Sequence, residues 1–137
     1  MPGFKIIDHV SEIGVEATGH DLKEAFASAA LGMFSIIVEL ESVEAREKIE
    51  VEVEAPNQED LLVAWLNELI YRLEGQNMVF CKFDVAELTG IRLKALCWGE
   101  KADQARHRFK TGVKSATYHA LKVENGRPAM VRVVLDI

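Results

Sequence analysis

A short segment near the middle of the chain alternates between apolar and acidic residues. Residues 49–55 read IEVEVEA. Because successive side chains of a β-strand point to opposite faces, this pattern predicts a strand with one apolar face and one acidic face. The acidic face is expected to be the outer, solvated face of a sheet, and the apolar face must be covered by another layer.

Two amphipathic helices are predicted on either side of this strand. Asp21 is the expected N-cap of the first helix, with Glu24 in the capping-box position, whereas Asn57 caps the second helix and Gly75 ends it. Gly32 lies inside the first helix at a cost of about 1 kcal/mol relative to alanine, so we expect another element to pack closely against it. Apolar residues recur at helical spacing at Leu22, Phe26, Ala29, Ala30, Met33 and Ile37, and at Leu62, Trp65, Leu66, Leu69 and Leu73.

The remaining strands are predicted from apolar runs bounded by turn residues. They are residues 4–8, residues 14–18, a hairpin of 79–88 with 91–98, and a hairpin of 113–124 with 129–137. Residues 99–112 are polar and basic and are expected to form a long loop. The resulting fold class is α+β, a two-layer sandwich of a mostly antiparallel sheet with two main helices, in a single domain spanning residues 1–137.

The composition is that of a globular protein, with 49% hydrophobic and 28% charged residues among 137. A net charge of −6 argues against a dedicated nucleic-acid-binding domain. The charge is uneven, because residues 1–90 carry −12 and residues 91–137 carry +6. This asymmetry is consistent with steering of partners of either sign, and equally with two solvated faces.

Cysteine usage and the lack of targeting segments predict a cytoplasmic location. Cys81 and Cys97 lie in apolar runs without C-x-x-C spacing, so buried free thiols in a reducing compartment are expected. The N-terminus does not resemble a signal peptide, and no apolar run approaches the ~20 residues of a membrane span.

Common catalytic motifs are missing: the sequence contains no P-loop, G-x-G-x-x-G, H-E-x-x-H or G-x-S-x-G. The segment from Asp8 to Glu12 does bring two carboxylates and His9 together. With the carboxylates at Asp136 and at the chain end, these groups could supply the oxygen ligands that Ca²⁺ or Mg²⁺ requires. Two alternatives remain open. In the first, Asp136 only keeps an edge strand soluble. In the second, Asp8, His9 and Glu12 serve as acid–base groups of a small phosphate-processing enzyme, with the basic loop as an anion clamp.

A second polar cluster follows the motif Trp98-Gly99-Glu100. It contains Arg106, His107, Arg108, Lys110 and Lys114, with Thr117-Tyr118-His119 on the next strand. Such a loop can bind phosphate or an acidic protein surface. The alternative is a solvated loop, with His119 satisfied in or near the core.

The order of these motifs along the chain is more specific than any one of them. The motifs are Ile6-Ile7-Asp8-His9 followed by Gly14, the helix Ala25-Phe26 to Phe34, Trp98-Gly99-Glu100, Arg106-His107 to Lys110, Val113-Lys114, Thr117-Tyr118-His119, and the ending Val133-Val134-Leu135-Asp136-Ile137. Together they resemble the archease family, from the first predicted strand to the last residue.

The resemblance implies a protein cofactor rather than an enzyme. Archeases activate the GTP-dependent RNA ligase that joins RNA 3′-phosphate ends in tRNA splicing and RNA repair, by promoting guanylylation of the ligase and multiple turnover. The implied partner is the ligase, and RNA is reached only indirectly. An alternative family description is a general chaperone or modulator of RNA- or DNA-processing proteins, such as a tRNA methyltransferase.

The resemblance also implies a divalent-cation site, usually described as calcium. The family's ligands correspond to Glu12, Asp136 and Ile137, with Asp8 as a further candidate. The family commonly has Thr-Ala-Asp where this chain has Val10-Ser11-Glu12, and the longer glutamate side chain alters the position of the ligating oxygens. His107 and Lys110 are the residues predicted to contact the partner.

Overall fold

The computed structural model describes residues 2–8 and 11–137. The elements follow in the order β1 (Gly3–Asp8), β2 (Glu12–Gly19), α1 (Leu22–Ile37), the short 3₁₀ helix η1 (Leu40–Ser42), β3 (Glu47–Glu54), α2 (Gln58–Gln76), β4 (Met78–Leu88), β5 (Arg92–Lys101), β6 (Ser115–Glu124) and β7 (Ala129–Asp136).

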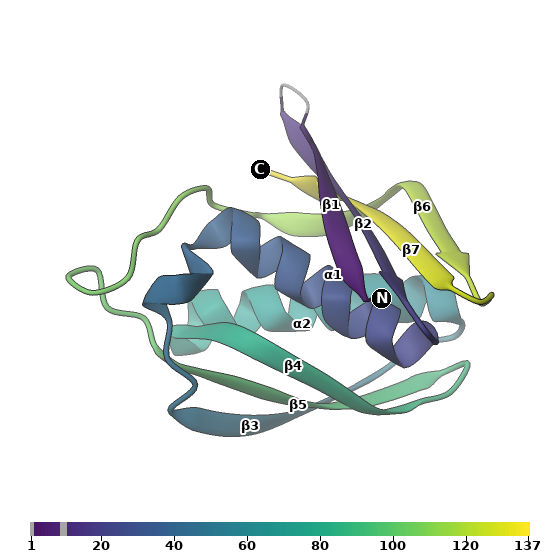
Figure 1. Ribbon diagram of the computed structural model, residues 1–137, viewed down its shortest axis with the longest axis horizontal. Helices are drawn as coiled ribbons and strands as arrows, with labels where there is room; N and C mark the ends of the chain where they lie inside the picture. Colours follow the sequence, from purple (N-terminus) through teal and green to yellow (C-terminus); the bar gives the residue numbers. More distant parts are fainter. Residues whose placement is uncertain (1, 9–10) are drawn as a thin grey trace.

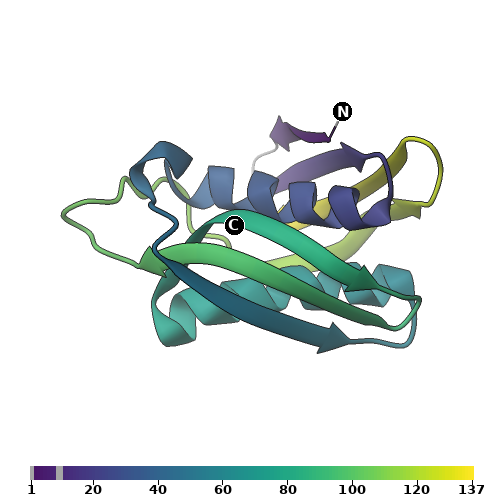
Figure 2. The same cartoon turned by 60° about the horizontal axis from the view of Figure 1, so that its bottom comes forward.

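The strands form two sheets with the two long helices between them (Figures 1 and 2). In the described chain, one sheet has the order β1-β2-β7-β6 and the other the order β3-β5-β4. All pairings are antiparallel. Helix α1 contacts β2 and β4, and helix α2 contacts β6 and β3, so each helix bridges both sheets. The loop of residues 102–114 leads from β5 in one sheet to β6 in the other, at one end of the molecule (Figure 1).

The α+β class and both predicted hairpins, β4–β5 and β6–β7, are confirmed. The arrangement differs from the expected two layers because the strands divide between two sheets. The acidic–apolar strand β3 pairs with β5 in the smaller sheet, whereas β7 pairs with β2 in the larger one. The helices are therefore covered on two sides, which explains why α1 is apolar around most of its circumference.

The predicted helix starts are confirmed, and one predicted helix end is wrong. The Glu24 N–H donates to the Asp21 carboxylate at 3.0 Å, and the Asp60 N–H donates to the Asn57 side chain at 2.8 Å. The second helix continues through Gly75 to Gln76, and Asn77 ends it with a left-handed backbone, φ 57°. Asparagine tolerates this conformation better than most residues, so it serves as the stop in place of glycine.

Gly32 allows the larger sheet to approach α1 closely, as its position in the helix predicted. A Cβ atom at Gly32 would lie 2.8 Å from Cγ1 of Val15 and 3.0 Å from Cγ of Phe4. One continuous hydrophobic cluster contains residues from both helices and both sheets.

Both cysteines are free thiols, as predicted, but only Cys97 is buried, whereas Cys81 is half-buried. Burial raises the pKa of Cys97 to about 12 and also raises that of Cys81. Among the described residues, no helix combines the length and apolar character needed to cross a bilayer.

Candidate functional site

The end of the larger sheet brings together Glu12 and Asp136, two carboxylates that are 124 positions apart in the chain. They are directly paired across β2 and β7, and directly opposed residues of an antiparallel pair project from the same face. Ile13 and Leu135, the next residues inward, are buried on the helix side. Glu12 and Asp136 therefore lie on the outer face, where Asp136 is exposed and Glu12 is half-buried.

Main-chain hydrogen bonds hold the chain end in position. The carbonyl of Asp136 accepts a hydrogen bond from the Lys114 N–H at 2.7 Å, and the N–H of Ile137 approaches the carbonyl of Ser11 at 3.5 Å. The Ile137 side chain packs against the core. The oxygens of Ile137 are thus anchored beside the segment that carries Glu12.

Asp8 lies on the other face of the sheet. It pairs with Ile13, and the strand alternation turns Ile13 and Glu12 in opposite directions. Asp8 is exposed and shares no face with Glu12 and Asp136. His9, the third member of the proposed acid–base group, lies outside the described residues.

This end of the sheet offers some, but not all, of the oxygen ligands that a hard cation requires. Carboxylate and main-chain oxygens are the ligands that Ca²⁺ and Mg²⁺ prefer. Within residues 2–8 and 11–137, neither Glu12 nor Asp136 has an ion pair or side-chain hydrogen bond, so both carboxylates are available. The same part of the chain contains no cluster of three His, Cys, Asp or Glu side chains, so a cation here would need oxygens from Ile137, water or a partner as well.

A second polar centre is built around Glu100, at the end of β5. Its Oε2 accepts hydrogen bonds from the Glu44 N–H at 2.7 Å and from Arg106 at 2.6 Å, and lies 2.8 Å from Nε2 of His107. Arg46 lies 3.1 Å from the other carboxylate oxygen. Burial raises the pKa of Glu100, but the hydrogen bonds from Glu44, His107 and Arg106 outweigh this effect and lower the pKa to about 2.

His107 is a buried part of this centre, which corrects its predicted role in direct partner contact. Its side chain is 0% exposed. Its Nδ1 accepts a hydrogen bond from the Asp103 N–H at 2.9 Å, so the proton of the neutral ring lies on Nε2 and is donated to Glu100. The ring folds the start of the 102–114 loop onto β5.

Lys110 is exposed and anchors the same loop to the end of α1. Its Nζ donates a hydrogen bond to the carbonyl of Ser35 at 2.8 Å, and its main-chain N–H donates one to the carbonyl of Ile37 at 2.8 Å. A cation beside the last carbonyls of a helix is electrostatically favourable. The loop therefore runs from Glu100, past the end of α1, to Lys114 beside Asp136.

Residues 91–137, which carry the net positive charge, do not form a single surface. Residues 92–101 lie in the smaller sheet, whereas residues 115–136 lie in the larger one. The residue that sequence reasoning missed is Arg46, an arginine of the acidic half that contacts Glu100. Only the fold brings it there, since nothing near Arg46 in the sequence resembles a binding motif.

Known proteins match this chain along its whole length. The model of the Archease protein family (MTH1598/TM1083) matches residues 4–137. Protein archease of Pyrococcus abyssi is 40% identical over 143 residues, covering 100% of each chain, and protein archease of Sulfurisphaera tokodaii is 35% identical over 139 residues with the same coverage.

Solved structures share the fold. The solution structure of Methanobacterium thermoautotrophicum protein 1598 matches with a TM-score of 0.82 and 31% identity, over 98% of this chain and 99% of that one. The crystal structure of an archease from Thermotoga maritima, described as a possible chaperone, has a TM-score of 0.58 and 23% identity over 97% of this chain and 96% of that one, and supports the fold alone. The chain belongs to the archease family.

Proposed function

We propose that this protein is a non-catalytic cofactor of a GTP-dependent RNA ligase, and that it promotes guanylylation and multiple turnover of the ligase in tRNA splicing or RNA repair. Family membership supports the choice of partner. We propose the cytoplasm as its location, because both cysteines are free thiols.

The observation that carries the proposal is the pairing of half-buried Glu12 with exposed Asp136 on the outer face at the end of the larger sheet. Two carboxylates without an ion pair among the described residues, at an anchored chain end, can reach a partner protein without unfolding either strand. The pair would approach the ligase active site, where it would help to position a cation or the GTP phosphates for attack by the ligase nucleophile.

Glu12, Asp136 and Ile137 would hold a divalent cation, and Ca²⁺ is our choice because the donors are all hard oxygens. When bound, such an ion supplies positive charge near phosphate oxygens. The chain itself contributes the fixed spacing of the two carboxylates, which the β2–β7 register sets. It also contributes the hydrogen bond from Lys114 that holds Asp136 in place.

The decisive experiment measures guanylylation of the cognate ligase in the presence of wild-type protein, Asp136→Ala, and a variant lacking Ile137. We expect both variants to lose most of the stimulation. Glu16→Gln is the matched control, because Glu16 lies on the same face of β2 but is engaged by Arg132 at 2.8 Å. Wild-type stimulation by Asp136→Ala and by the shortened chain would exclude this role for the sheet end.

The 102–114 loop is the second proposed contact. Lys110 is exposed and would meet the ligase surface or its RNA, whereas His107 would act by keeping the loop folded. Unchanged ligase binding by the double variant His107→Ala, Lys110→Ala would remove the loop from the interface.

A general chaperone or modulator of RNA- or DNA-processing proteins, such as a tRNA methyltransferase, is the second candidate function. Two apolar side chains favour it: Phe4 and Ile6 of β1 are 37% and 39% exposed, and chaperones bind clients through exposed apolar surface. Suppression of aggregation of unrelated proteins would support this candidate, and stimulation restricted to the ligase would argue against it.

A further inference from the structure

Helix α1 is buried over most of its circumference but is open along one stripe. Lys23, Ala27 and Leu31 recur at intervals of four residues and therefore share one face of the helix. Lys23 is exposed, and Ala27 and Leu31 are half-buried, whereas the residues beside them are largely buried. The two sheets thus leave a seam along α1.

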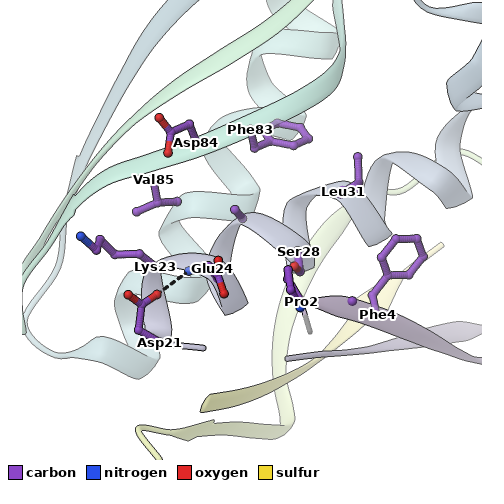
Figure 3. A pocket seen from close by; sticks show the side chains of 12 residues that line it. Pro2, Phe4, Asp21, Lys23, Glu24, Ser28, Leu31, Phe83, Asp84 and Val85 are labelled. Carbon is purple, nitrogen blue, oxygen red and sulfur yellow. Dashed lines mark hydrogen bonds between the residues drawn. The ribbon is translucent and has the colours of Figure 1, made fainter. Parts of the chain in front are cut away.

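The seam is bordered by an edge strand of each sheet. β1 is an edge of the larger sheet and β4 an edge of the smaller one. Figure 3 shows Pro2, which precedes β1, and Phe4 of β1 on one side of the stripe, and Phe83, Asp84 and Val85 of β4 on the other. Together they enclose a groove of about 760 Å³, with α1 as its floor.

Part of the inner surface of the groove is apolar. Phe4 of β1 projects toward the helix side of the sheet, since it pairs with the core residue Ala17. Leu31 contributes from the floor, and Phe83 from the opposite wall. A bound segment would therefore cover apolar surface that the chain leaves partly exposed.

The rim of the groove is acidic. Among the described residues that line it, three carboxylates, from Asp21, Glu24 and Asp84, stand against one ammonium, that of Lys23. Asp84 is exposed and lies on the outer face of β4. These carboxylates favour a basic occupant over an acidic one. Lys82, on the same outer face as Asp84, is the opposing charge, and its ammonium is engaged over the ring of Trp98.

The free edge of β4 is regular where it borders the groove. Irregular pairing with β5 interrupts the strand between Phe80 and Lys82 and again between Val85 and Glu87. Bulges of this kind protect an edge strand from unwanted pairing. The run Lys82–Val85 between them keeps a regular register, and no described strand pairs with its outer side.

We propose that this groove binds an extended peptide segment of a partner protein, which adds a short strand to β4 at Lys82–Val85. Its inward side chains are apolar and contact Leu31 and Phe83, and a basic outward side chain lies near Asp84. Main-chain hydrogen bonds supply affinity in this mode of recognition, and the alternating side chains supply specificity. The proposal does not depend on the ligase or on the cation site.

The test uses the full-length, ¹⁵N-labelled protein and an acetylated, amidated heptapeptide of alternating valine and lysine. Titration should shift the amide resonances of Phe4, Leu31 and residues 82–85, and should slow hydrogen exchange along β4. The same peptide with glutamate in place of lysine should bind at least tenfold more weakly. Asp84→Lys should weaken the lysine peptide about fivefold, as expected for an exposed charge pair.

Two controls separate strand addition from general attraction. Glu50→Lys makes the same charge change on the outer face of β3, in the same cross-strand row as Asp84, and should leave binding unchanged. In an alternating peptide, the backbone N–H groups of the valines point to one edge of the added strand and those of the lysines to the other. One peptide is methylated at every valine backbone nitrogen and a second at every lysine backbone nitrogen. One of these two peptides should bind at least tenfold more weakly than the parent.

Three peptide-binding results would overturn the proposal. They are the absence of peptide binding at millimolar concentration, equal binding of both methylated peptides and the parent, and amide shifts confined to surfaces outside the groove. Self-association of the free protein that Asp84→Lys abolishes would assign the groove to a second copy of the chain, and would also overturn it.

Discussion

The imidazole Nε2 of His107 lies 2.8 Å from the carboxylate of Glu100, and both side chains are buried. The carboxylate also forms ion pairs with Arg106 and Arg46, and it accepts a hydrogen bond from the Glu44 N–H. Glu100 is thus the point at which three segments meet: the end of β5, residues 44–46 before β3, and the 102–114 loop. A buried charge is stable only when it is paired in this way.

Stability should depend on the ionisation of Glu100. Its pKa in the folded protein is about 2, below the ordinary glutamate value of about 4.3. A group with a lowered pKa contributes stability that is complete above the unfolded pKa, and that is lost as the pH falls toward the folded pKa. We expect Glu100→Gln to lower the free energy of unfolding at pH 7 by about 1–3 kcal/mol, and to flatten its decline between pH 4.5 and pH 2.

Urea unfolding of both proteins at several pH values measures this effect. Glu50→Gln, which removes an exposed carboxylate from the outer face of β3, is the control and should behave like wild type. A pH profile of Glu100→Gln parallel to that of wild type would contradict the assignment.

His107→Ala and Lys110→Ala should affect the loop in different ways. His107→Ala removes the acceptor of the Asp103 N–H and one donor to Glu100, so we expect a loss of about 1–3 kcal/mol and faster hydrogen exchange of the Asp103 amide. Lys110→Ala changes an exposed side chain and should alter stability by about 0.5 kcal/mol or less. Equal protection of the Asp103 amide in His107→Ala and wild type would show that the ring does not order the loop.

Local features of the fold could be predicted from the sequence because their causes are local. The caps Asp21 and Asn57 act on N–H groups three residues away, and the hairpins follow from turn residues between apolar runs. The end of the second helix was misjudged because Asn77 and Gly75 are both suitable stops, and packing against the rest of the protein decides between them. The division into two sheets was missed because any alternating strand can pair with several others, and alternation does not identify the partner.

The candidate site was predicted unevenly for the same reason. The resemblance to the archease family implied that Glu12 and Asp136 are cation ligands. The β2–β7 register shows why residues so far apart in the sequence can act together. Burial of His107 could not be predicted, since a loop rich in arginine and lysine gives no sign of the carboxylate that it covers. Arg46 reaches Glu100 across 54 positions, a distance over which sequence pattern carries no information.

Calcium should stabilise the protein if the sheet end holds it. A ligand that binds only the folded state adds about 2.7 kcal/mol at a concentration 100 times its Kd. Asp136→Asn and Glu12→Gln should each abolish most of this gain, whereas Glu16→Gln should retain it because Arg132 already engages that carboxylate. Calorimetric titration with CaCl₂ measures the Kd for calcium, and thermal unfolding with and without calcium measures the gain in stability. A calcium effect that is equal in all four proteins would place the ion elsewhere.

The glycines inside the two helices should respond in opposite ways to alanine. Alanine favours a helix over glycine by about 1 kcal/mol, so propensity alone predicts that both substitutions stabilise. At Gly75 the new methyl group would lie 3.1 Å from the ring of Tyr71, a side chain 57% exposed that can move aside, and we expect Gly75→Ala to stabilise by up to about 1 kcal/mol.

At Gly32 the methyl group would lie 2.8 Å from Val15, which is 0% exposed. Phe4 can shift because it is partly exposed, but Val15 cannot move without displacing β2 from α1. Overpacking of this kind costs about 1–3 kcal/mol, more than the gain in propensity, so Gly32→Ala should destabilise the protein. Urea unfolding of the two variants and of wild type gives the sign of the change in the free energy of unfolding for each substitution. If Gly32→Ala proves as stabilising as Gly75→Ala, then β2 does not approach α1 as closely as the structure indicates.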